Sequence, residues 1–264
     1  MSKSKSPPTS TIHSATDLRA VLLRPSTSRK SVPRYILTFY LESRLNDRIE
    51  FGVYDKEAEL LQTFRDLPHW FQPGATTFIT FRTIDSMPKS TLQLWYRQQV
   101  DWFRRIGIEA TFETLDQLVS QLSDGQQNSF LKRKNQSWNN YLHQGFGECL
   151  LQRIEIANIV ADALRFFDGD RYDLDCFVIM PNHVHVIVQF RKGLRLGKQT
   201  DSWLRFSATQ INRMLGRQGS FWHPEPFDHL IRSLEEFEYL RKYVRENPIK
   251  AKLKSGTFLY WSRD

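Results

Sequence analysis

Two histidines separated by a single valine form the group in this chain best suited to holding a metal ion. His183, Val184 and His185 belong to the apolar run VIMPNHVHVIV, residues 178–188. In a β-strand alternate side chains face the same side, so both imidazoles share one face and Val184 lies on the other. Imidazoles at this spacing can reach one ion, and imidazole is an ordinary ligand for manganese, zinc, iron or nickel. Two hydrogen-bonded histidines at a sheet surface are the alternative, which the spacing by itself fits equally well.

A tyrosine and an asparagine near the C-terminus form a second candidate group. Tyr243 and Asn247 are four residues apart, so in a helix they lie about 40° apart on one face at ~100° per residue. There a phenol and an amide oxygen can approach one site together. The apolar stripe of this helix is formed by Phe237, Leu240 and Val244. Tyr243 borders that stripe whereas Tyr239 projects away from it; a tyrosine that only packs its ring at the core boundary is the alternative.

The elements that position these residues follow from hydrophobic periodicity and turn signals. Strands are predicted at residues 76–82, 172–179 and 183–190. Helices are predicted at 88–106, 154–167, 198–215 and 234–246, and the helix-prone segment 112–147 is interrupted at Asp124-Gly125 and at Gly145-Phe146-Gly147. Ser233 is the expected N-cap of the last helix, Glu236 completes a capping box, and Pro248 ends or bends the helix. Strands separated by helices, with one close strand pair, indicate an α+β fold with a mainly antiparallel sheet.

The first part of the chain differs in composition from the rest. Residues 1–33 are rich in Ser, Thr, Pro and Arg, which predicts a mostly disordered tail with a short helix at 15–23. Residues 34–42 and 48–54 are predicted to form a hairpin. The main domain is expected to start near Leu67, which gives an N-terminal extension, 1–66, and a domain, 67–264. Neither a secretory signal nor a membrane span is predicted, and Cys149 and Cys176 are expected to be free thiols in a reducing cytoplasm.

The charge balance favours a polyanionic partner. The 264 residues include 37 Lys and Arg against 29 Asp and Glu, a net charge of +8. The candidate contacts to nucleic acid are Arg191, Lys192, Arg195, Lys198, Arg205, Arg213 and Arg217. Trp203 and Phe206 interleave with them and could stack on unpaired bases. For these two aromatic residues, packing against the core is the favoured interpretation.

The histidine strand and the tyrosine helix together resemble a known family. The segment VIMPNHVHVIV is similar to the signature of the REP-associated tyrosine transposases, a branch of the single-tyrosine HUH insertion-sequence transposases. Their second signature, a helix with a nucleophilic tyrosine that ends in Asn-Pro, is matched from Tyr243 to Pro248. The resemblance covers residues 67–253. Family members often carry a lysine after the helix tryptophan, where this chain has Leu204, and a glutamine where it has His223.

This resemblance implies a fold, a reaction and a partner. The fold is a ferredoxin-like antiparallel sheet with helices packed on it, the HUH endonuclease fold. The resemblance implies that His183, His185 and Asn247 hold Mg²⁺ or Mn²⁺, and that Tyr243 attacks the DNA to give a 5′-phosphotyrosine. His229 is a candidate for assisting proton removal; a histidine capping a strand end is the alternative for it. The expected partner is single-stranded or hairpin DNA and no membrane, for a monomer or homodimer in the bacterial cytoplasm at the nucleoid.

Three other functions fit parts of these observations. The first is an HUH nuclease of another purpose, such as a replication initiator or relaxase. The second is a domesticated DNA-binding protein that does not cut. The third is an unrelated His-x-His metalloenzyme that acts on small molecules, which the basic charge and the Tyr243–Asn247 pair disfavour.

Overall fold

The computed structural model describes residues 49–64, 68–191 and 193–263. Residues Phe51–Asp264 form one compact unit. The predicted tail, its short helix at 15–23 and the strand at 34–42 lie outside the described residues. Of the predicted strand at 48–54, the described part forms only an isolated bridge, from Gly52 to Ala75.

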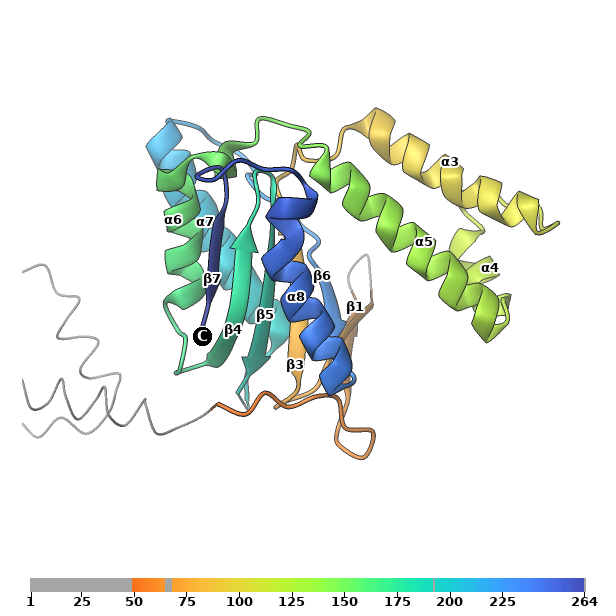
Figure 1. Ribbon diagram of the computed structural model, residues 1–264, viewed down its shortest axis with the longest axis horizontal. Helices are drawn as coiled ribbons and strands as arrows, with labels where there is room; N and C mark the ends of the chain where they lie inside the picture. The colour runs from red at the N-terminus through yellow and green to blue at the C-terminus, as the bar shows by residue number, and fades with distance from the viewer. Residues whose placement is uncertain (1–48, 65–67, 192, 264) are drawn as a thin grey trace, which may run out of the picture. The chain divides into compact units, whose positions relative to one another are not determined.

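A five-stranded antiparallel sheet forms the centre of the unit (Figure 1). Its strands, in the order in which they lie side by side, are β6 (Phe227–Leu230), β3 (Thr76–Arg82), β5 (His183–Phe190), β4 (Tyr172–Ile179) and β7 (Leu259–Ser262). Without β7 this is a βαββαβ arrangement, in which β3 and β5 are central and one helical connection follows each. The predicted α+β, ferredoxin-like fold is therefore confirmed. A separate two-stranded sheet pairs β1 (Leu61–Phe64) with β2 (Pro68–Phe71).

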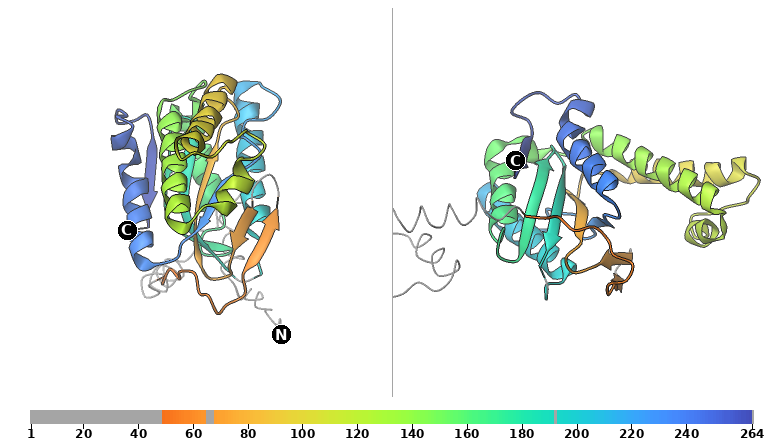
Figure 2. Two further views of the ribbon diagram at one scale, coloured as in Figure 1. Left: turned by 90° about the vertical axis from the view of Figure 1, so that its right-hand side faces the viewer. Right: turned by 60° about the horizontal axis from the view of Figure 1, so that its bottom comes forward.

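Helices cover both faces of the five-stranded sheet (Figure 2). On one face lie α6 (Ile154–Arg165) and α7 (Leu196–Leu215), which pack against alternate residues of β5, among them Val184 and Val186. On the other face lies α8 (Leu234–Lys250), which packs against Phe78 and Ile187. The period-2 alternation of β5 therefore turns Val184, Val186 and Val188 toward the α6–α7 side and the two histidines toward α8.

A helical insertion lies between β3 and the short 3-10 helix η1 (Leu150–Gln152) that precedes α6. It contains α3 (Lys89–Arg105), α4 (Leu115–Gln121) and α5 (Asp124–His143). In Figure 1, α3 and α5 run side by side away from the sheet. The insertion has a small core of its own, in which Phe103 and Phe130 are buried. It meets the main domain at the C-terminal end of α5.

The predicted strands and helices that carry the histidines and the tyrosine match the structure closely, whereas β1, β2 and β7 were not predicted. The strands at 76–82, 172–179 and 183–190 have the predicted bounds. The predicted interruption of the segment 112–147 is present but lies two residues earlier: α4 ends at Gln121, and α5 begins at Asp124 with Ser123 and Gln126 as its capping box. The second predicted interruption, at Gly145–Gly147, follows the end of α5 at His143. Pro248 does not end α8, which continues to Lys250. Its ring nitrogen cannot donate to the carbonyl of Val244, but the helical bonding resumes after it, because the N–H of Ala251 donates to the carbonyl of Asn247 at 3.0 Å.

The start of α8 satisfies half of the predicted capping box. The hydroxyl of Ser233 accepts from the backbone N–H of Glu236 at 3.2 Å. The carboxylate of Glu236 accepts instead from the N–H of Arg232 at 2.7 Å. A strand that the sequence did not indicate, β6, lies in the segment just before this helix.

Residues before Leu67 also contact the sheet. The ring of Phe51 stacks on Phe237 of α8 at 5.6 Å between centroids. Gly52 lies so close to the chain that a β-carbon there would meet the carbonyl oxygen of Gly74 at 2.5 Å, so only glycine fits this approach. The division of the chain at Leu67 into an extension and a domain stays a prediction. In the part of the chain that the structure describes, no helix is both long and apolar enough to cross a membrane.

Candidate active site

The two histidines of β5 lie side by side on the sheet face under α8. Each side chain is 1% exposed, and their ring centroids are 4.8 Å apart. Pairing with β3 places His185 opposite Thr80 and His183 opposite Arg82. The strand alternation predicted from the sequence thus brings both imidazoles to one buried position.

Hydrogen bonds at the Nδ1 atoms orient both rings. Asn182 donates its amide N–H to the carbonyl of Phe146 at 3.0 Å, so its Oδ1 is left to accept from Nδ1–H of His183 at 2.8 Å. This fixes the tautomer of His183 with a lone pair on Nε2. Nε2 of His183 is buried and has no hydrogen-bond partner among the described residues. In His185, Nδ1 lies 2.7 Å from the hydroxyl of Thr80.

Helix α8 brings the tyrosine and the asparagine to the same place. The Tyr243 hydroxyl lies 3.5 Å from Nε2 of His185, and its ring packs edge-on against His185 at 5.2 Å and Phe78 at 6.0 Å. Asn247 is completely buried, and its Nδ2 has no partner among the described residues. Tyr239, by contrast, is 66% exposed. Of the two tyrosines, only Tyr243 faces the histidines.

A third histidine, which the sequence did not indicate, reaches this site from the helical insertion. Nε2 of His143, the last residue of α5, lies 2.9 Å from Oδ1 of Asn247. Its ring stacks over that of His183, with 6.2 Å between centroids. In the sequence His143 stands in a polar, helix-prone segment with no motif around it, so no local signal marks it. Asn182 and Thr80, the partners of the Nδ1 atoms, were likewise not predicted.

Burial controls the protonation of the site. It lowers the pKa of His183 well below the usual value, and the neighbouring His185 and His143 lower it further. Burial, with a smaller effect of His143, lowers the pKa of His185 to about 3. Burial also raises the pKa of Tyr243 to about 12. The imidazoles are therefore neutral at physiological pH, as metal ligands must be, and the phenol keeps its proton until a neighbouring charge favours its loss.

These residues fit a divalent metal ion with an incomplete protein ligand set. The unpartnered, buried Nε2 of His183 is a polar atom that burial without a partner makes costly, and a metal ion would satisfy it. A carbonyl oxygen has two lone pairs, so Oδ1 of Asn247 could bind an ion while accepting from His143. Among the described residues, no three His, Cys, Asp or Glu side chains are grouped to hold an ion. An ion held by His183, His185 and Asn247 would keep positions open for phosphate oxygens.

His229 and the basic residues are placed elsewhere. Nε2 of His229, on β6, lies 2.8 Å from the carboxylate of Glu236. The ring of Tyr243 instead contacts Phe78 and His185, and the ammonium group of Lys250 lies 5.5 Å from its centroid. No contact joins His229 to the Tyr243 hydroxyl among the described residues. Its role as a proton acceptor stays a prediction that the geometry does not favour.

The predicted DNA contacts follow β5 or lie on or beside α7, which covers the sheet face opposite the histidines. Arg191 forms two hydrogen bonds with the carboxylate of Asp173, at 2.8 and 3.0 Å. Arg217 pairs in the same way with Glu148. Arg195 precedes α7 as its N-cap residue, the exposed residues on the helix include Arg205 and Arg213, and Lys192 lies outside the described residues. The structure therefore does not bring this set together with Tyr243.

The aromatic residues of α7 divide between the core and the surface. Trp203 is 2% exposed and its indole N–H donates to the Tyr172 hydroxyl at 2.9 Å. Phe206 is 50% exposed. Trp203 is therefore a core residue, as expected, whereas Phe206 is not.

Comparison with known proteins gives a likeness in structure but no match to a family model or to a curated protein. Among solved structures the chain is similar to one described as "Structure of the REP associates tyrosine transposase bound to a REP hairpin". The two share 15% sequence identity over 71% of this chain and 74% of that one, with a TM-score of 0.36.

Proposed function

We propose that this protein is a metal-dependent transposase of the single-tyrosine HUH type, which cuts and rejoins single-stranded DNA beside hairpins through a tyrosine-linked intermediate. One observation carries the proposal. His183, His185, Tyr243 and Asn247, which the two sequence signatures single out, meet in one buried cluster. There the Tyr243 hydroxyl lies 3.5 Å from Nε2 of His185. Burial of these polar groups around an imidazole nitrogen without a partner would only cost stability in a core that has no function.

The residues divide the chemistry among them. Tyr243 supplies the nucleophilic oxygen: a bond forms from Oη to phosphorus while the bond from phosphorus to the 3′-oxygen breaks. The phenolic proton is released and the 3′-oxygen gains a proton, which leaves a 5′-phosphotyrosine and a free 3′-hydroxyl. No ATP is needed for later strand transfer, because the phosphodiester bond is exchanged rather than hydrolysed.

The raised pKa of Tyr243 (about 12) defines what the rest of the site must do. A bound divalent ion would offset the negative charge that develops on the phosphate and would favour loss of the phenolic proton. His183 and His185 would hold it through their Nε2 atoms. Asn182 and Thr80 keep those nitrogens aimed at the site through Nδ1, the outer-shell arrangement usual for histidine ligands.

The test is a covalent adduct between protein and DNA. Labelled single strands, each with a short hairpin, are incubated with the full chain and Mg²⁺ or Mn²⁺ and analysed on a denaturing gel. The wild type should yield a protein-linked strand, and Tyr243→Phe, which removes one oxygen, should yield none. Tyr239→Phe is the matched control on the same helix, and its exposed side chain should leave adduct formation intact.

The same assay separates the other candidates. A domesticated binder would retain DNA without any adduct, and a metalloenzyme for small molecules would give neither. A replication or relaxase relative would form the adduct but would not rejoin the strand to a second hairpin-flanked end. An adduct formed by folded Tyr243→Phe would overturn the proposal.

A further inference from the structure

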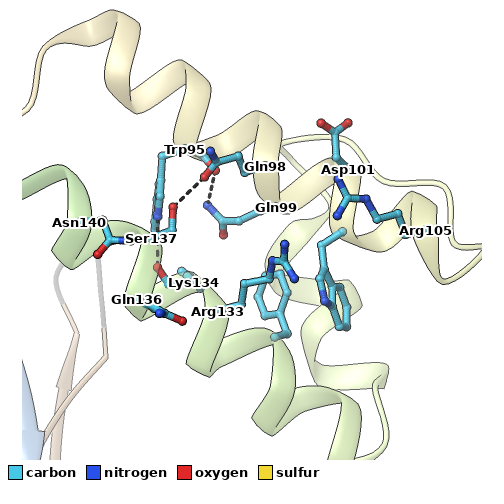
Figure 3. A pocket seen from close by; sticks show the side chains of 12 residues that line it. Trp95, Gln98, Gln99, Asp101, Arg105, Arg133, Lys134, Gln136, Ser137 and Asn140 are labelled. Carbon is cyan, nitrogen blue, oxygen red and sulfur yellow. Dashed lines mark hydrogen bonds between the residues drawn. The ribbon is translucent and has the colours of Figure 1, made fainter.

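The helical insertion contains a groove that the reaction described above does not use. It lies between α3 and α5, has a volume of about 500 Å³, and is lined by residues of both helices (Figure 3). The lining residues are Trp95, Gln98, Gln99, Asp101, Trp102, Arg105, Phe130, Arg133, Lys134, Gln136, Ser137 and Asn140. Phe130 alone has no polar atom in its side chain.

The charges that line the groove favour an anion. The lining includes three cationic side chains, Arg105, Arg133 and Lys134, but only one carboxylate, that of Asp101. Among the described residues, neither Arg105 nor Arg133 has an acidic side chain within ion-pair distance, and both are exposed. Figure 3 shows Arg133 extending from α5 into the space between the helices. Lys134 lies with its ammonium group 5.5 Å from the ring centroid of Trp95.

The remaining lining groups suit nucleobases. Trp102 is half-buried: its ring packs against Phe130 at 5.0 Å between centroids, which leaves part of the indole open to the groove. The amides of Gln136 and Asn140 both line the groove with exposed side chains. Aromatic faces beside cations and amides are the composition by which proteins bind unpaired strands.

One face of α5 connects this groove to the active site. Arg133, Gln136, Asn140 and His143 follow one another at spacings of three, four and three residues, so they form a single stripe along the helix. The stripe begins in the groove and ends at His143, which bonds Asn247 beside Tyr243. At 1.5 Å per residue, its length is about 15 Å. A strand held at Tyr243 could therefore follow α5 into the groove.

We infer that the groove between α3 and α5 binds the single-stranded DNA adjoining the nucleotide that is cut. This inference rests on the proposed function, since it names where the substrate of that site continues. Arg105 and Arg133 contact backbone phosphates, Trp102 stacks on a base, and Gln136 and Asn140 contact base edges. The helical insertion is then the part of the chain that reads the flank of the cut, separate from the basic residues around α7.

The experiment measures binding apart from cutting. The full chain carrying Tyr243→Phe, which keeps the ring but cannot form the adduct, is titrated with fluorescent oligo(dT) strands at several salt concentrations. In this background the pair Arg105→Gln and Arg133→Gln removes two groove cations. The matched control, Arg97→Gln with Lys132→Gln, removes the same charge from exposed positions of the same two helices that do not line the groove.

The groove pair should weaken binding by about tenfold or more and should lower the slope of log K against log salt by about 1.4, the contribution of two phosphate contacts on a single strand. The control pair should change both quantities much less. Equal losses in the two pairs, or no loss in the groove pair, would overturn the inference. So would a parent protein that does not bind oligo(dT) at all, which would leave a protein partner as the occupant of the groove.

The result is distinguishable from failure of the proposed function. Loss of oligo(dT) binding in the groove pair, with no adduct from the wild type under any condition, would leave the groove as a DNA-binding site on a protein that does not cut. Conversely, the wild type could form the adduct while the groove pair binds oligo(dT) normally. That result would support the transposase function and show that the groove does not bind its DNA.

Discussion

Nε2 of His143 lies 2.9 Å from Oδ1 of Asn247, across 104 residues of sequence. This bond joins the end of the helical insertion to the helix that carries Tyr243. It holds the Asn247 side chain with its oxygen toward an N–H donor, an orientation in which the second lone pair of that oxygen remains available. The insertion is therefore attached to the candidate active site by a specific polar contact and not by apolar packing alone.

If His143 orients Asn247, removal of the His143 side chain should lower the affinity of the site for a metal ion. We expect His143→Ala to weaken Mn²⁺ binding, measured by calorimetry without DNA, by about tenfold to a hundredfold, the usual effect of losing an outer-shell partner. His143→Gln can still donate to Asn247 and should lose less. Equal affinities in wild type and His143→Ala would show that Asn247 needs no such support.

The two strand histidines should be required for metal binding but not for DNA binding. An ion at a hundredfold excess over its Kd stabilises the folded state by about 2.7 kcal/mol, so Mn²⁺ should raise the Tm of the wild type by roughly 5 °C or more. His183→Ala and His185→Ala should abolish that shift and the adduct while oligo(dT) binding persists. His223→Ala, a half-buried histidine of another segment, is the control. Normal cleavage by His183→Ala would remove the metal assignment.

The buried histidines should make the metal-free protein sensitive to acid. Burial lowers the pKa of folded His185 to about 3, below the value of about 6.5 expected in the unfolded chain. The unfolded state therefore binds the additional proton first, and stability falls as the pH drops from about 6.5 toward 3. The protonation of His185 can lower the free energy of unfolding by at most about 5 kcal/mol. Urea unfolding in EDTA should show the loss. His185→Gln should reduce it but not remove it, because the pKa of the buried His183 is also lowered; a parallel pH dependence in the two proteins would contradict the expectation.

Replacement of the two aromatic residues of α7 should lower the stability of the protein by different amounts. Trp203 is buried and bonded to Tyr172, so Trp203→Ala should lower the free energy of unfolding by about 3–5 kcal/mol. Phe206→Ala, on the same helix with a half-exposed ring, should cost much less. Chemical denaturation measures both. If Trp203→Ala instead kept its stability and lost only DNA affinity, Trp203 would be a stacking residue and not part of the core.

The sequence by itself determined the strands and helices that carry the candidate site, and which side chains share a face of each. The run around His183 and His185 has a period of two, and period-2 alternation fixes which side chains share a face without reference to any other part of the chain. The same local logic predicted that Tyr243 and Asn247 share one face of a helix, and that Tyr239 points away. These patterns depend only on residues within a few positions of one another, so they could be read before the fold was known.

Only the tertiary structure decided which faces meet. The pairing of β3 with β5 placed Thr80 beside His185, and the packing of α8 on that sheet face placed the Tyr243 hydroxyl beside the same ring. His143 arrives from an insertion whose own sequence shows no motif, and the basic residues of α7 lie across the sheet from the site. Contacts between segments a hundred residues apart arise from the packing of whole elements. No local period encodes that packing, and for this reason the third histidine appears only in the folded chain.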